Sequence, residues 1–113
     1  MNTPEAISAM TALAQETRLQ VFRLLVRAGP TGLMAGEIAE AAEALPSTMS
    51  HHLGLLERAG LVTSRRSGRS IIYAADYEGI RRLLSFLMED CCQGRPEICG
   101  SGLSPAASCV ETI

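Results

Sequence analysis

Apolar residues recur every three or four positions along most of the chain as far as Asp90, which is the period of an amphipathic α-helix. Between residues 61 and 75 the pattern changes to two short strand-like runs, Leu61–Arg65 and Ser70–Ala75, with a turn expected at Ser67-Gly68. The sequence therefore predicts a mainly α fold with a small β-hairpin, in the order of a winged helix-turn-helix. The predicted helices cover residues 4–14, 16–27, 35–42, 46–59 and 76–90.

The helix predicted at 46–59 has two unlike faces. At about 100° per residue, Met49, Leu53 and Leu56 share one side, and we expect them in the core. His52 lies nearer this side than His51, and we expect it to be structural. Short polar side chains on the other side can reach base edges or phosphates in a major groove. They predict a DNA-binding role for Ser47, Thr48, Ser50 and His51.

The helix predicted at 16–27 carries an apolar stripe and three arginines. We expect the stripe to face inward and Arg18, Arg23 and Arg27 to face water. The stripe consists of Leu19, Phe22, Leu25 and Val26.

The first and last helices also carry apolar stripes. Ile7 and Met10 belong to the first, and Leu84 and Leu87 belong to the last. A chain of 113 residues cannot bury both stripes well by itself. We therefore expect a homodimer, which would present two DNA-reading helices about one DNA turn (~34 Å) apart.

The charge is distributed unevenly along the chain. The formal net charge is −2, which excludes a protein that binds polyanions by bulk charge, and the 4% of aromatic residues argues against stacking on single strands. Residues 45–75, however, hold four arginines against one acid, a local charge of +3. Basic side chains on the hairpin can neutralise phosphates, although arginines on an exposed hairpin are as often simply solvated. The three candidates there are Arg65, Arg66 and Arg69.

All four cysteines lie in the last quarter of the chain, at positions 91, 92, 99 and 109. No apolar run approaches the roughly 20 residues that span a bilayer, and the first residues do not resemble a signal peptide. We therefore expect no membrane association and a cytoplasmic location, where cysteines are mainly thiols. The sequence predicts one DNA-binding and dimerisation domain over residues 1–92 and an irregular, cysteine-containing tail over 93–113.

Three stretches resemble the ArsR/SmtB family of bacterial metal-responsive repressors: Leu13–Leu19, Gly36–Ala41 and Ser47–Val62. Within the third, Ser50-His51-His52-Leu53 followed by Ala59-Gly60-Leu61-Val62 is similar to the family's recognition helix leading into its wing. The resemblance covers about Leu13 to Cys92. It implies a homodimer that holds double-stranded operator DNA until a metal or metalloid releases it.

The chain departs from the family pattern at two metal sites. The helix before the recognition helix has no thiol over Leu33–Ile38, where the best-known arsenic site has two cysteines. The last helix has no histidine, so a zinc site of the family's other type is not expected there. Sensing must then use the C-terminal cysteines, as in a similar subset of arsenic repressors.

Three of the cysteines, Cys91, Cys92 and Cys99, are the expected ligands of the inducer. Arsenic(III) and antimony(III) are soft ions that thiolates bind well, and three sulfurs complete a pyramidal site. Neighbouring cysteines diverge by about 100° in an intact helix, so the helix must end there, which Gly94 and Pro96 favour. Cys109 is expected to be dispensable. We expect no organic cofactor.

Other readings of the cysteines remain open. Any single one is as easily a small buried hydrophobe, and the cluster can also act as a thiol-redox switch on a repressor of the same fold. A small thiol enzyme, such as an arsenate reductase, is disfavoured. No C-x5-R loop is present, because Glu97 and Ile98 occupy the positions where the arginine would stand. We therefore expect a DNA-binding repressor and not an enzyme.

Overall fold

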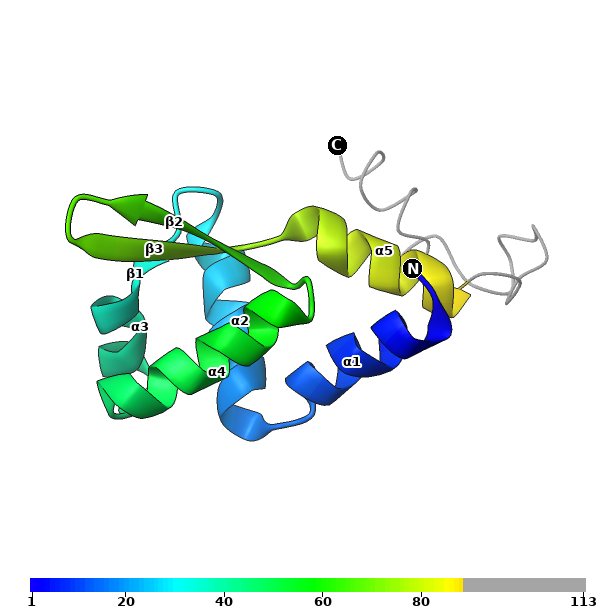
Figure 1. The fold of residues 1–113 in the computed structure, drawn as a ribbon, viewed down its shortest axis with the longest axis horizontal. Coiled ribbons are helices and arrows are strands. Elements are labelled where there is room, and N and C mark those ends of the chain that lie inside the picture. Colours follow the sequence, from blue (N-terminus) through cyan, green and yellow to red (C-terminus); the bar gives the residue numbers. More distant parts are fainter. Residues whose placement is uncertain (89–113) are drawn as a thin grey trace.

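The computed structural model describes residues 1–88 of the chain. It confirms a mainly helical winged helix-turn-helix with a small antiparallel sheet (Figure 1). None of the helices in this part of the chain is both long and apolar enough to cross a membrane. The elements are α1 (Thr3–Leu13), α2 (Glu16–Ala28), β1 (Leu33–Met34), α3 (Ala35–Ala41), α4 (Pro46–Arg58), β2 (Val62–Ser67), β3 (Ser70–Ala75) and α5 (Tyr77–Met88).

The sheet has three strands where the sequence predicted a two-stranded hairpin. Strand β1 pairs antiparallel with β3, with Leu33 opposite Tyr73, so that the order is β1-β3-β2. A strand of two residues carries no readable alternation, which is why the sequence did not reveal it. Gly32 makes the pairing possible, because it has a φ of 73° and lies so close to the Tyr73 carbonyl oxygen that a Cβ would overlap it.

The core forms where α2 and α4 pack together beneath β3. Phe22 and Leu25 are buried as predicted, but Leu19 and Val26 are 44% and 39% exposed, so that part of the predicted inward stripe is wrong. Val21 is buried in their place. Two apolar stripes fit a helical period equally well: one through residues 19, 22 and 26, and one through residues 21, 22 and 25. Packing against α4 and β3 selects the second.

Helices α1 and α5 lie side by side, away from the wing formed by β2 and β3 (Figure 1). The fully buried side chains of helix α1 are all small, namely Ala6, Ala9 and Ala12. Its larger apolar side chains Ile7 and Met10 are 54% and 40% exposed, and Leu84 and Leu87 of α5 are 42% and 46% exposed. A single protomer therefore leaves apolar surface on both terminal helices, as the short chain predicts.

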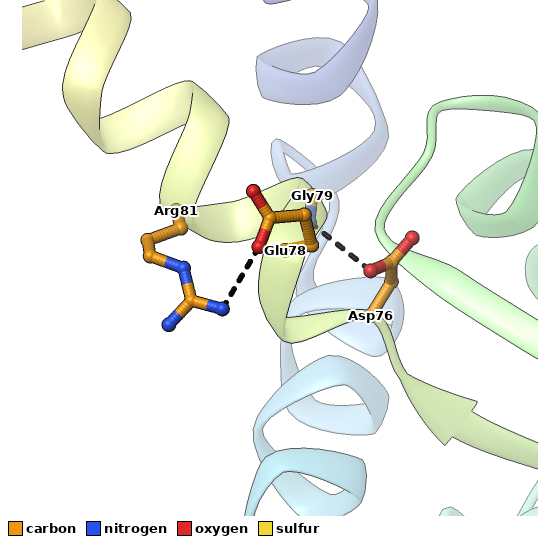
Figure 2. Close-up of polar contacts among 4 residues, drawn as sticks. All are labelled: Asp76, Glu78, Gly79 and Arg81. Carbon is orange, nitrogen blue, oxygen red and sulfur yellow. Dashed lines mark hydrogen bonds and ion pairs between the residues drawn. The ribbon is translucent and has the colours of Figure 1, made fainter. Parts of the chain in front are cut away.

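The start of α5 is fixed by local contacts (Figure 2). The Gly79 N–H donates to the Asp76 carboxylate at 3.1 Å, which caps the helix, and Arg81 forms an exposed ion pair with Glu78 at 2.9 Å. Gly79 is buried against the carbonyl of Gly60, in the turn between α4 and β2. This close approach joins α5 to the end of the recognition helix.

A methyl group at Gly79 has no room. We expect Gly79→Ala to destabilise the fold by about 1–3 kcal/mol, because the added Cβ overlaps backbone that cannot move independently. Gly36→Ala is the matched control, since nothing lies near a Cβ at that helical position in α3. It should stabilise the protein by about 0.4–1 kcal/mol. Urea unfolding measures both, and equal midpoints would contradict the close approach.

Candidate nucleic-acid interface

Helix α4 presents a polar face to solvent and an apolar face to the core. Met49, Leu53 and Leu56 are at most 1% exposed, as the sequence predicted. Leu45 precedes the helix in an extended conformation, and Pro46 occupies its first turn, where a missing N–H costs no hydrogen bond. All four side chains proposed to contact DNA from this helix are exposed: Ser47, Thr48, Ser50 and His51.

A tight turn sets α4 against α3. The Ala44 N–H donates to the Ala39 carbonyl at 3.0 Å, and Glu43 has a φ of 55°. Ile38 is fully buried beneath this turn, whereas Ala42 is only partly buried. Helices α3 and α4 thus form the helix-turn-helix, in which the second helix carries the exposed polar face.

The wing carries its three arginines in different settings. Neighbouring strand residues point to opposite faces, so Arg65, opposite Ile72, and Arg66, opposite Ile71, do not share a face. Arg65 donates to the Thr31 carbonyl at 2.9 Å. Arg66 is exposed, and Arg69 is exposed in the turn between β2 and β3. The wing is therefore basic on both faces and at its tip.

A direct contact holds the wing to α4. The Ser64 hydroxyl of β2 donates to the Glu57 carboxylate of α4 at 2.7 Å. Tyr73 is the partner of Ser64 in β3, and burial, with the Glu57 charge second, raises the pKa of the Tyr73 phenol. Glu57 is the only acid in the basic stretch 45–75, and it serves to join the two candidate DNA-contacting elements.

His52 is buried with 9% of its surface exposed, and a structural place for it was predicted. The sequence did not predict which side chain contacts it. Arg18 was expected to face water, but it is half-buried, and its Nη1 lies 3.3 Å from His52 Nδ1. Burial, then the charges of Arg18 and His51, lower the pKa of His52. The expectation failed because Arg18 precedes the buried Val21 and Phe22 by one turn, where a long side chain can reach back to the end of α1.

The proposed ligands Cys91, Cys92 and Cys99 lie outside the described residues, as do Cys109 and the tail 93–113. Within residues 1–88, no group of three or more His, Cys, Asp or Glu side chains could hold a metal ion.

Known proteins match this arrangement. A helix-turn-helix domain model matches residues 13–65. The transcriptional activator HlyU of Vibrio cholerae is 29% identical over 92 residues, which cover 81% of this chain and 82% of HlyU. YbzH of Bacillus subtilis, an uncharacterized HTH-type transcriptional regulator, is 30% identical over 95 residues, covering 74% of this chain and 95% of YbzH. A putative arsenical resistance operon repressor, ArsR of Halobacterium salinarum, is 36% identical over 73 residues, covering 65% of this chain and 56% of ArsR.

Solved structures agree with the sequence relatives. The homodimeric winged helix-turn-helix domain of a possible ArsR-family regulator from Mycobacterium bovis superposes with a TM-score of 0.63 at 26% identity, covering 83% of this chain and 84% of that one. This chain belongs to the ArsR/SmtB family of transcriptional regulators. The match to the domain model spans α2, α3, α4 and part of β2. It therefore includes all of α4, the candidate recognition helix of this ArsR/SmtB protein. The relatives named above all carry the names of transcriptional regulators.

Proposed function

We propose that this chain is a homodimeric repressor that binds operator DNA and releases it when arsenic(III) or antimony(III) binds Cys91, Cys92 and Cys99. The observation that carries the DNA-binding part is the two-faced recognition helix α4. Its apolar side is locked in the core, so its polar side must face outward. The basic wing is joined to that helix through the contact between Ser64 and Glu57.

The two elements make different kinds of contact with DNA. Serine and threonine hydroxyls and an imidazole can bond to base edges in the major groove, and these groups carry sequence discrimination. Arginines on the wing bond to phosphates, which fixes position without reading sequence. Arg65 can serve in this way although it is bound to the Thr31 carbonyl, because one guanidinium has five N–H donors.

Dimerisation through α1 and α5 is the simplest use of their exposed apolar side chains. Four of these, Ile7, Met10, Leu84 and Leu87, are each 40–54% exposed in one protomer. Burying them against a second copy would remove apolar area from water at both helices at once. The similar domain from Mycobacterium bovis is described as homodimeric, which supports a dimer.

The inducer is proposed from the chemistry of the cysteines. Thiolates are soft donors, and three of them suit arsenic(III) or antimony(III), whereas structural zinc takes four ligands. Cys91 follows shortly after Met88, the last described residue of α5. Related regulators are named for arsenical and cadmium resistance, which supports sensing of a thiophilic ion.

A thiol-redox switch is the second candidate. It keeps the same DNA-binding domain, and disulfide formation between cysteines of the tail takes the place of metalloid binding. The relative HlyU supports it, because one of its structures is described as reduced HlyU, at 30% identity and a TM-score of 0.60, covering 80% of this chain and 92% of that one. Mass spectrometry of the reduced protein with arsenite separates the two candidates, since only a bound metalloid adds its mass without oxidation.

Substitutions on α4 and on the wing should have different effects on DNA binding. Ser50→Ala or His51→Ala should lower discrimination between selected and scrambled duplexes by about 1–3 kcal/mol. Arg65→Ala, Arg66→Ala or Arg69→Ala should weaken binding to both duplexes and reduce the salt slope by about 1.

Fluorescence anisotropy over a range of salt concentrations measures these effects, and Arg23→Ala, on the exposed side of α2, is the control. Unchanged binding in all five test variants would show that the DNA surface is assigned wrongly.

Removing apolar surface from α5 should prevent dimerisation. Leu84→Glu combined with Leu87→Glu places two charges in the proposed interface, where burial is costly, and should yield a folded monomer. Sedimentation velocity at micromolar concentration measures this. Ile71→Glu is the control, because Ile71 is 39% exposed on β3 and lies outside the proposed interface. A parent protein that sediments as a monomer would contradict the assembly.

Each of the three proposed ligands should be needed for release and not for DNA binding. Cys91→Ser, Cys92→Ser and Cys99→Ser should bind the selected duplex like the parent but ignore arsenite. When arsenite is added, the parent and Cys109→Ser should lose affinity for the selected duplex by roughly 5–150-fold. Titration under reducing conditions with arsenite measures this. Release that persists in Cys99→Ser and is lost in Cys109→Ser would move the third ligand to Cys109, and normal release without both Cys91 and Cys92 would rule out the site.

A further inference from the structure

Arg18 belongs to α2 and contacts both α1 and α4. Its backbone N–H donates to the Gln15 side chain at 2.8 Å, at the start of α2. Its side-chain Nε donates to the Ala12 carbonyl of α1 at 2.7 Å, and its Nη1 lies 3.3 Å from the His52 ring on α4. One part-buried side chain thus joins the helix proposed for dimerisation to the helix proposed to read DNA.

The α1 contact satisfies a group that the helix itself cannot satisfy. Ala12 is one residue from the end of α1, and the last four carbonyls of a helix have no intrahelical N–H partner. A charged donor makes a shorter and stronger hydrogen bond to such a carbonyl than a neutral one. Arg18 is therefore held at α1 independently of its contact with α4.

The α4 contact fixes the chemical state of His52. A guanidinium can only donate, so a hydrogen bond at this contact requires Nδ1 to accept with its lone pair, in a neutral ring with its proton on Nε2. The burial of His52, and the positive charge of Arg18 beside it, favour the same neutral form.

We propose that Arg18 and His52 are positioning residues, which hold α4 at a fixed orientation relative to α1 and so set the affinity for DNA. This inference rests on the proposed DNA-binding function. Met49, Leu53 and Leu56 fix which face of the helix is buried. The hydrogen bond at His52, next to the exposed His51, adds a directional constraint on the orientation of the helix.

The link depends on pH in a defined direction. The charged groups that act on His52 within residues 1–88 are Arg18 from α2 and His51 from α4, and α1 contributes the uncharged Ala12 carbonyl near Arg18. Protonation of Nδ1 removes the acceptor and places a second cation beside the guanidinium. Because the pKa of His52 is lowered in the folded protein, the link is intact at neutral pH and is lost as the pH falls through that lowered pKa.

The first experiment needs no DNA. Long-range ¹H–¹⁵N spectra of the histidine rings report which nitrogen carries the proton during a pH titration. We expect His52 to carry it on Nε2 and to titrate below the ordinary histidine range, and His51 provides the internal comparison. A proton on Nδ1 at neutral pH would overturn the link.

The second experiment measures affinity for a duplex that the parent protein selects from a random pool. Arg18→Lys keeps the charge, but one ammonium cannot replace a guanidinium that reaches Ala12 and His52 through separate nitrogens, and affinity should fall about tenfold. Arg23→Lys makes the same exchange on the exposed side of α2 and should change nothing. Circular dichroism at the assay temperature establishes that each variant is folded.

The pH readout separates positioning from general stability. His51→Asn is used as the background, because it removes the other titrating ring. In that protein affinity should fall about tenfold as the pH falls through the pKa of His52, which the titration of the ring locates, while the fold persists. Adding His52→Asn, whose amide oxygen can accept from Arg18 and does not titrate, should abolish the fall.

The outcomes distinguish this inference from the function on which it rests. If the parent selects no duplex, the DNA-binding proposal itself fails. If the parent selects a duplex that Arg18→Lys binds equally well, or if the pH profile survives His52→Asn, only the positioning role is wrong.

Discussion

The burial of one side of α4 is the constraint on which the remaining structure depends. Met49, Leu53 and Leu56 are at most 1% exposed and bring α2, α3 and the wing together around them. Once they are buried, the helical period leaves the polar side of the same helix in solvent. Core packing and the candidate DNA surface are therefore two sides of one short segment.

The molecule separates its proposed tasks along its length. The wing and α4 lie at one end, and the paired helices α1 and α5 lie at the other, with their larger apolar side chains exposed (Figure 1). Two of the contacts that connect the ends are especially close. Gly79 of α5 lies against the turn that follows α4, and Arg18 joins the end of α1 to His52. A rearrangement at the end of α5 would have short physical routes to the recognition helix through these contacts.

Polar contacts in this protein mainly orient elements that apolar burial holds together. Glu57 joins α4 to the wing through Ser64, and Asp76 caps α5 through Gly79. Each exposed contact of this kind adds little stability by itself. Their value lies in direction, because the preferred geometry of a hydrogen bond adds to the constraint that packing already sets. This division suits a protein whose proposed partner is read by side chains at fixed spacing.

The sequence by itself determined the five helices, the hairpin and the two faces of α4, because helical and strand periods are local properties of neighbouring residues. The family followed from local motifs for the same reason. Only the tertiary structure decided that β1 completes the sheet, that Val21 and not Leu19 or Val26 faces the core, and that Arg18 turns inward to His52. These outcomes depend on distant partners: Arg18 and His52 are 34 positions apart, and Leu33 and Tyr73 are 40 positions apart. Periodicity defines a face of a helix or strand, and the packing of distant elements decides what that face meets.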